Sequence, residues 1–453
     1  MRNVGIISCV LVVLFLLTSC GRGQPEESPV TEYPATYEAY AEPAEYEPQT
    51  PEPISISESA PEPAPAPRCL TDVFRSGHTR AEYLEDLDYL YGMFKANFPL
   101  FQPFYRRYGV CLHELFQNAR HRLETADASR NYSLDRILQG DIFVHTNWFG
   151  HLWVMQDARW ARSRLAGYAA WGNIPFVEVF DNPATRAFYG LTDADFEPQD
   201  IQVQAVQQYQ PGNVETQILE PGNIAYVRIR QMSYHNMEND YIRLIQFYEE
   251  IANYGHLIID IRGNPGGTCR YFLRLVMAPN ISEPLNHTNY FFLPAAEHNL
   301  RFMEARGWLP YFEPVYPELF ERMPYFQTQD SEILDYYMRI NDWTYPSRDE
   351  AIFGGKIWLL TDEGSASASG LAAAVVRETG FATIVGAPAR GGFGGVNPTI
   401  LALPNTGIIV QYQMLYATCS QGRNGYEHGV PPHIQNFEGM GALETVLKII
   451  NDM

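Results

Sequence analysis

Small residues cluster directly after one of the most apolar runs of the chain. The run 356–361 (KIWLLT) predicts a buried strand, and the segment 364–370 (GSASASG) leads from it into a small-residue helix that ends near Gly380. A serine in such a turn lies at the carboxyl end of a strand and near the positive end of a helix dipole, where it can act as a nucleophile. Alone, this pattern is a weak signal, because turns rich in serine, alanine and glycine are common.

A second turn makes the pattern more specific. The segment 260–267 (DIRGNPGG) ends another apolar run, 256–261 (HLIIDI), with three glycines. A turn of this kind can present backbone N–H groups to a developing oxyanion, where loss of one donor costs about 3–4 kcal/mol of transition-state stabilisation. A phosphate-binding loop is the competing interpretation, but neither the P-loop pattern nor G-x-G-x-x-G is present.

Two groups of elements must position these turns. Alternating strand and helix patterns at 223–229, 241–254, 256–261, 356–361, 382–386 and 400–403 predict an α/β core. Apolar residues at helical spacing in 80–98, 110–124 and 133–144 predict a small helical unit over 69–155. The aromatic-rich stretch 283–350 interrupts the core, and it is interpreted either as a packed helical insertion or as a lid or groove wall.

The pair of turns resembles the S41 family of serine peptidases, the tail-specific and tricorn-core group. The segments 380–386 (GFATIVG) and 429–432 (GVPP) strengthen the resemblance, which covers roughly 220–440. It implies an α/β fold with a crotonase-like (ClpP-like) repeated ββα core, an N-terminal helical cap domain over 69–155, and an S41-like peptidase domain over 156–453. It also implies hydrolysis of peptide bonds, with Ser367 as nucleophile and an oxyanion hole formed by Gly266 or Gly267 together with the N–H of Ala368.

The chain departs from the tail-specific branch at the general base. That branch places a lysine in a turn after the serine helix, and the matching position here is Gly392. The three lysines of the chain are Lys95, Lys356 and Lys448, and none has the matching context. Arg390 is near in sequence, but a guanidinium with a pKa above about 12 cannot act as a base at neutral pH. A Ser–Lys dyad is therefore not expected.

A histidine is the expected base instead. His151 in 148–154 (WFGHLWV) resembles the glycine–histidine motif of the tricorn-like branch and of related lipoproteins, with Phe149 at the usual acidic position. Glu427 in 426–432 (YEHGVPP) matches the glutamate that orients this histidine, and His433 stands at a usual aspartate position. His428 is the alternative base, because His151 could instead be a structural histidine.

The N-terminus is typical of an exported lipoprotein. Residues 1–19 have the pattern of a signal peptide, and Leu17-Thr18-Ser19-Cys20 resembles a lipobox, which implies cleavage before Cys20 and its lipidation. Residues 20–68 then form a predicted disordered linker, with ten glutamates and no basic residue between 24 and 67. These features predict a protein of the cell envelope, held to the membrane by the lipid alone and facing outside the cytoplasm.

Charge and metal-ligand patterns exclude other classes. The net charge of −21 argues against nucleic-acid binding, which needs a basic surface. No HExxH spacing and no Cys/His cluster is present, so we expect neither a metal nor another cofactor. Cys69 and Cys111 could form a disulfide outside the cytoplasm, or they could be buried thiols.

The sequence thus predicts a lipid-anchored serine peptidase that acts on peptides or proteins through an acyl-enzyme. Ser367, His151 and Glu427 are its expected triad. The alternative is a non-catalytic S41-like lipoprotein that binds a peptide or a hydrophobic ligand. The sequence predicts neither the cleavage specificity nor the oligomeric state.

Overall fold

The computed structural model describes Phe74 and residues 76–127, 132–146, 149–170, 172–197, 212–391 and 398–453. The predicted signal peptide, Cys20 and the linker lie outside these residues, as do Cys69 and Gly392. The Cys69–Cys111 disulfide therefore stays a prediction. Within the described residues, no helix is long and apolar enough to cross a membrane.

The core is a six-stranded sheet in the order β13-β9-β8-β4-β3-β2. Its strands are β2 (Val214–Glu220), β3 (Ile224–Ile229), β4 (His256–Asp260), β8 (Lys356–Thr361), β9 (Thr383–Gly386) and β13 (Ile434–Gln435). β2 runs antiparallel to β3, whereas every other neighbouring pair is parallel. The strands predicted at 223–229, 256–261, 356–361 and 382–386 are all confirmed to within one residue.

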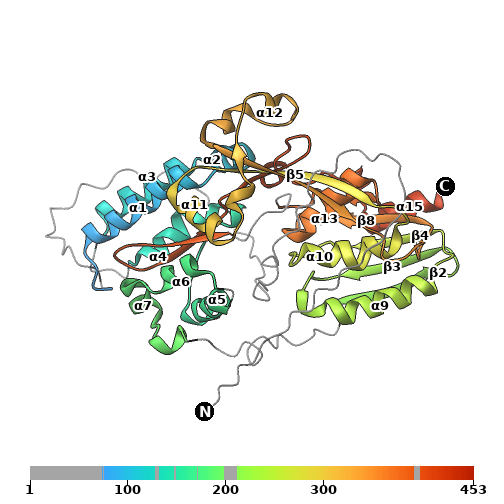
Figure 1. Ribbon diagram of the computed structural model, residues 1–453, viewed down its shortest axis with the longest axis horizontal. Helices are drawn as coiled ribbons and strands as arrows, with labels where there is room; N and C mark the ends of the chain where they lie inside the picture. The colour runs from blue at the N-terminus through green and yellow to red at the C-terminus, as the bar shows by residue number, and fades with distance from the viewer. Residues whose placement is uncertain are drawn as a thin grey trace, which may run out of the picture. The chain divides into compact units, whose positions relative to one another are not determined.

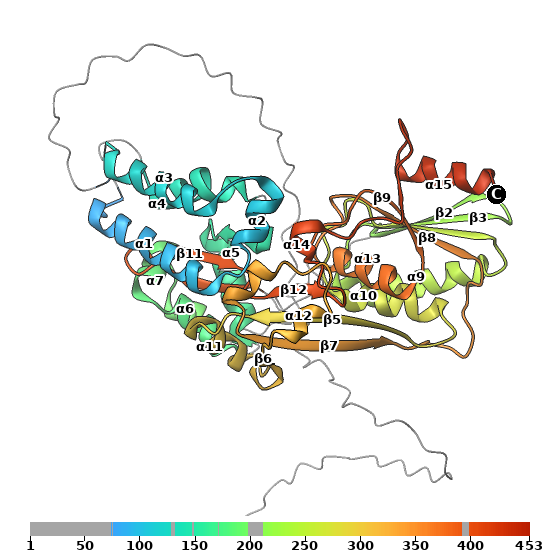
Figure 2. The same ribbon diagram turned by 90° about the horizontal axis from the view of Figure 1, so that it is seen from above.

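Helices cover both faces of this sheet (Figures 1 and 2). On one face lie α9 (Met237–Glu250), α10 (Cys269–Phe272) and α13 (Ala368–Thr379), and on the other lies α15 (Ala442–Asn451). Ile357 and Leu359 of β8 pack in the first apolar cluster, while Trp358 and Leu360 pack with α15 in the second. Because β8 is buried on both faces, its sequence is an almost continuous apolar run.

The aromatic-rich stretch is built on strands, so its interpretation as a helical insertion is wrong. β5 (Leu285–Leu293) and β7 (Tyr336–Thr344) pair antiparallel over nine residues each, in a sheet of order β12-β5-β7-β6. β6 is Glu313–Pro314 and β12 is Tyr416–Cys419. Short helices join the strands: α11 (Glu297–Ala305), α12 (Glu318–Glu321) and the 3₁₀ helix η10 (Thr328–Ile333). Whether this stretch acts as a lid or groove wall stays a prediction.

The helical part of the chain extends beyond the expected boundary at residue 155. Its helices are α1 (Arg80–Asn97), α2 (Phe101–Tyr108), α3 (Leu112–Thr125), α4 (Leu134–Ile137), α5 (Ala158–Ala170), α6 (Ile174–Phe180) and α7 (Pro183–Tyr189). A third sheet of order β1-β11-β10 accompanies them, with β1 at Trp153–Val154, β10 at Thr399–Ala402 and β11 at Ile409–Tyr412. The strand predicted at 400–403 therefore exists, but it pairs in this sheet and not in the core.

Candidate functional site

Ser367 occupies an unusual backbone conformation at the start of α13. It is the N-cap residue of this helix, with φ 53° and ψ −118°. Among the described non-glycine residues, positive φ occurs at Ser367 and at His151 (φ 54°). Such conformations cost about 1–3 kcal/mol each and persist where the surrounding structure holds them in place. The two described residues with this strain are the predicted nucleophile and the predicted base.

The three serines of the turn have different surroundings. The Ser365 hydroxyl is buried and donates to the carbonyl oxygen of Ile261 at 2.8 Å. The Ser369 hydroxyl is also buried and donates to Oδ1 of Asn264 at 2.8 Å. The Ser367 hydroxyl is partly exposed and forms no hydrogen bond to any other described residue. Ser367 is thus the serine of this turn whose oxygen is available for chemistry.

Asn264 connects the glycine turn (residues 260–267) to the serine turn (residues 364–370). Its Nδ2 donates to the carbonyl oxygen of Ile229 at 2.9 Å, and its Oδ1 accepts from the N–H of Gly266 at 2.9 Å. Its own carbonyl oxygen accepts from the N–H of Ala366 at 2.9 Å. Since Ser369 also donates to this side chain, one buried amide fixes the distance between the two turns.

Two backbone N–H groups remain available beside the nucleophile. The N–H of Gly266 is used by Asn264, whereas the N–H groups of Gly267 and Ala368 have no acceptor within the described part of the chain. The turn lies directly against the start of α13, because a Cβ placed on Gly266 would fall 2.7 Å from the nitrogen of Ala368. Of the two glycines considered for the oxyanion hole, Gly267 therefore retains a free donor.

The chain passes Ser367 again just before the position of the missing lysine. The N–H of Arg390 donates to the carbonyl oxygen of Ser365 at 2.8 Å. A Cβ on Gly391 would lie 2.6 Å from the nitrogen of Ser367. The segment that carries a lysine base in the tail-specific branch thus reaches the nucleophile here as well, but it brings glycine and an arginine whose Nη2 pairs with Glu363.

His151 lies in a tight loop before β1. A Cβ on the preceding Gly150 would fall 2.9 Å from the side chains of both Phe98 and Leu100, so the loop packs closely on the helical part. Burial of the imidazole, with the charge of Arg164 adding to it, lowers the pKa of His151 to about 4. The ring is therefore neutral at pH 7. Its Nδ1 lies 3.0 Å from the hydroxyl oxygen of Tyr426.

Glu427, the predicted orienting acid, binds other groups. Its carboxylate accepts from Nε and Nη2 of Arg106, both at 2.7 Å, and Arg106 also binds Asp330 through two bonds of 2.9 and 2.6 Å. Nε2 of His428 lies 3.5 Å from the same carboxylate. Within the described residues, no hydrogen bond or ion pair joins His151 to Glu427 or to Ser367.

Phe149 and His433, which replace the usual acidic residues of the family motif, both contact neighbouring groups. Phe149 packs its ring against Phe104, Tyr108 and Tyr426, at centroid distances of 5.4, 5.7 and 5.8 Å. At the second position, Nδ1 of His433 accepts from the N–H of Ile384 in β9 at 2.9 Å, so this histidine is tied to the core sheet.

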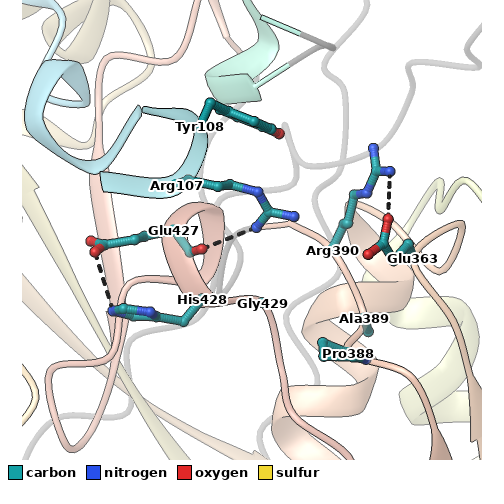
Figure 3. Close-up of a pocket in the computed structure, with 9 residues that line it drawn as sticks. All are labelled: Arg107, Tyr108, Glu363, Pro388, Ala389, Arg390, Glu427, His428 and Gly429. Carbon is teal, nitrogen blue, oxygen red and sulfur yellow. Dashed lines mark hydrogen bonds and ion pairs between the residues drawn. The ribbon is translucent and has the colours of Figure 1, made fainter. Parts of the chain in front are cut away.

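A pocket of about 410 Å³ adjoins the serine turn. The residues that line it are Arg107, Tyr108, Glu363, Pro388, Ala389, Arg390, Glu427, His428 and Gly429. Figure 3 shows the guanidinium groups of Arg107 and Arg390 reaching into it from different segments. Arg107 is held by the carbonyl oxygens of Tyr426 and Glu427, at 2.8 and 3.1 Å. The pocket therefore has a polar, partly basic wall.

Sequence reasoning missed three side chains near the site: Arg106, Asp330 and Tyr426. Arg106 and Asp330 lie 224 positions apart, and no local pattern connects them. Tyr426 had a signal only in its position next to Glu427. In the described segments, no cluster of three or more His, Cys, Asp or Glu side chains could hold a metal ion.

Comparison with known proteins identifies the family. Residues 223–436 match the model of peptidase family S41. The match covers just under half of the chain and supports a member of peptidase family S41. Its fold is the S41 peptidase fold of mixed α/β sheets and helices, while the crotonase-like description and the N-terminal cap stay predictions. No curated protein sequence matches the chain.

Several solved structures are similar to this chain. Mature CPAF covers 82% of this chain with 98% of its own length, at 14% identity and a TM-score of 0.49. The photosystem II D1 C-terminal processing protease covers 82% with 97% of its length, at 15% identity and a TM-score of 0.38. A lipoprotein from Streptococcus agalactiae covers 82% with 96% of its length, at 11% identity and a TM-score of 0.37.

Proposed function

We propose that this S41 member is a serine peptidase with Ser367 as nucleophile and His151 as general base. The observation that carries the proposal is the positive φ shared by these two residues. A strained backbone conformation persists only where the surrounding structure holds it in place. Such conformations cluster at active sites. The unbonded hydroxyl of Ser367 and its place at the start of α13 support the same assignment.

The proposed reaction is acyl transfer. The Ser367 oxygen attacks the scissile carbonyl carbon while Nε2 of His151 takes the hydroxyl proton. The tetrahedral oxyanion is bound by the N–H groups of Gly267 and Ala368, and the proton then passes to the leaving amine as the C–N bond breaks. Water, deprotonated by the same imidazole, hydrolyses the ester. In this proposal Glu427 does not contact the base. It binds Arg106, and this ion pair holds α14 (Gly425–His428) in place.

The second candidate function is non-catalytic binding of a peptide. One observation favours it: His151 meets a neutral phenol and no carboxylate within the described residues. An imidazolium without a nearby anion is less stable, so proton transfer from serine would be slow. The pocket beside the serine turn would then be a binding site alone.

A fluorophosphonate probe tests the proposal, because it phosphonylates an activated serine and needs no known substrate. We expect label on the wild-type protein, at Ser367 by mass spectrometry of the digested adduct. Ser367→Ala should take none, and heat-denatured protein serves as the background control. Absence of label on folded protein, under conditions where a known serine hydrolase reacts, would leave peptide binding as the function.

The pH profile of labelling provides a second check of the base. Because burial lowers the pKa of His151 to about 4, its neutral, basic form predominates at every pH above about 5. The labelling rate should therefore be nearly constant from pH 6 to 8. An ordinary histidine base, with its pKa of about 6.5, would instead lose most of its rate as the pH falls through 6.

The proposed location is the outer side of a membrane, with Cys20 as the lipid-bearing residue. The support is the lipobox-like segment Leu17-Thr18-Ser19-Cys20 and the charged linker after it. Cys20→Ser should release the protein from the membrane fraction and remove the lipid mass from its N-terminal peptide. If wild-type protein carries no lipid on Cys20, or if Cys20→Ser stays in the membrane fraction, the proposed lipid anchor is wrong.

A further inference from the structure

The two ring nitrogens of His151 must have different roles if it is the base. A neutral imidazole carries one proton, and the nitrogen without it is the basic one. To take a proton at Nε2, the ring must therefore hold its proton at Nδ1. In serine hydrolases of the triad type a carboxylate secures that tautomer. The group that lies against Nδ1 here is the Tyr426 hydroxyl, at 3.0 Å.

Glu427 is not free to take that part. Both of its oxygens accept from Arg106, and its side chain is 6% exposed. Arg106 is held in turn by Asp330, whose Oδ2 also accepts from the Tyr416 hydroxyl at 2.7 Å. To reach His151, Glu427 would have to leave a bidentate guanidinium and strand a buried charge, which is strongly unfavourable.

Tyr426 is held in place more firmly than a surface tyrosine. Its N–H donates to Oδ1 of the helix cap Asn424 at 2.9 Å, and its ring packs on Phe149 and on His151. Nε2 of Gln413 donates to its hydroxyl at 3.4 Å. Burial raises the pKa of Tyr426, so the hydroxyl is a neutral group at every pH at which the protein would work. Its position and its protonation state are thus both fixed.

We propose that the Tyr426 hydroxyl, and not a carboxylate, positions His151 by accepting a hydrogen bond from its Nδ1–H, which keeps the proton on Nδ1 and leaves Nε2 as the basic nitrogen. The inference rests on the proposed function, since it assigns the third group of the same site. Tyr426 is a positioning residue: it acts through His151 and touches no substrate. Phe149 at the usual acidic position fits this assignment, because it packs an apolar ring and no carboxylate against the tyrosine.

The direct test measures which nitrogen of His151 carries the proton. Nitrogen-15 chemical shifts of a histidine-labelled sample distinguish the two tautomers, and His151→Gln assigns the signal. We expect the Nδ1–H tautomer in the wild type at pH 7 and a mixture of tautomers in Tyr426→Phe. The same variant should react with the fluorophosphonate probe about tenfold to hundredfold more slowly, because a misplaced base loses rates of this order.

Two control variants separate positioning from general damage. Tyr189→Phe removes another buried hydroxyl, one that donates to Met155 and accepts from Ile409, and it should leave both the tautomer and the probe rate unchanged. Glu427→Gln keeps the Tyr426 hydroxyl, so it should change the tautomer less than Tyr426→Phe does. An Nε2–H tautomer in the wild type, or a tautomer that responds to Glu427→Gln and not to Tyr426→Phe, overturns the proposal.

The tautomer measurement does not depend on activity. If wild-type protein holds the Nδ1–H tautomer and Tyr426→Phe changes it, the positioning role stands even where no probe label forms. The peptidase proposal would then fail by itself.

Discussion

At the scale of single residues, Ser367 has a backbone conformation that lowers stability, although its hydroxyl is the proposed nucleophile. A side chain at φ 53° and ψ −118° meets its own backbone, while glycine adopts this conformation freely. The protein keeps a serine there although glycine would fit better. The hydroxyl therefore has a use that is worth a cost of about 1–3 kcal/mol.

At most helix positions an alanine variant is more stable than a glycine variant, and the strain at Ser367 predicts the opposite order there. Ser367→Gly should be more stable than Ser367→Ala by about 1 kcal/mol, because only glycine relieves the positive φ. Urea denaturation of both variants measures the difference. Gln246, exposed in the middle of α9, is the matched control: there Gln246→Gly should be less stable than Gln246→Ala by about 0.5–1 kcal/mol. The same order at both positions would mean that Ser367 is not strained.

At the scale of elements, the two turns work as one unit because the backbone of each contacts the other. Gly267 lies against Met232, whose N–H donates to Gly266 and whose carbonyl oxygen accepts from Thr268, both at 2.8 Å. This bridge holds the glycine turn at the end of β4, where it faces the start of α13. The proposed oxyanion donors come from one residue of each turn.

A Cβ at Gly267 should break this arrangement. It would fall 2.2 Å from the carbonyl oxygen of Met232, so the turn must shift and take its N–H group with it. Gly267→Ala should slow fluorophosphonate labelling about 100-fold or more, the cost of losing one oxyanion donor. Gly263→Ala is the control, because φ is also positive there (+70°) but nothing lies within 4 Å of the added carbon. Equal labelling rates in the two variants would remove Gly267 from the oxyanion hole.

The elements also show where sequence patterns suffice. β8 and the helix after it were predicted because an apolar run ended by glycine and serine has one simple interpretation. β5 misled because it is buried along most of its length and its polar and apolar residues do not alternate: Asn286–Asn289 are polar, whereas Tyr290–Leu293 are aromatic or apolar. Without alternation, a strand of this kind has no period that distinguishes it from a buried helix.

At the scale of the whole chain, Arg106 joins three segments that are distant in sequence. Its guanidinium on α2 binds Asp330 in η10 and Glu427 in α14, which lie 224 and 321 positions further on. The motif around Glu427 singles out a carboxylate, yet it carries no information on which group that carboxylate binds. That choice depends on tertiary packing between the helical part and the S41 segment, about which local periodicity carries no information.

Removal of Arg106 should therefore damage both stability and the site. Asp330 is 3% exposed, so Arg106→Met leaves two buried carboxylates without their counter-charge and should cost about 3–5 kcal/mol. Because Tyr426 precedes Glu427 on the same short helix, loosening α14 should also slow labelling of Ser367. Chemical denaturation measures the first effect and the probe measures the second.

Two further variants make this prediction specific to the buried network. Arg230→Met removes a guanidinium from an exposed pair with Glu215, and it should cost no more than about 1 kcal/mol. Adding Asp330→Asn and Glu427→Gln to Arg106→Met removes the stranded charges and should recover much of the lost stability. If Arg106→Met costs as little as Arg230→Met, the network does not hold α14. His151 would then owe its placement to its own loop and to Tyr426 alone.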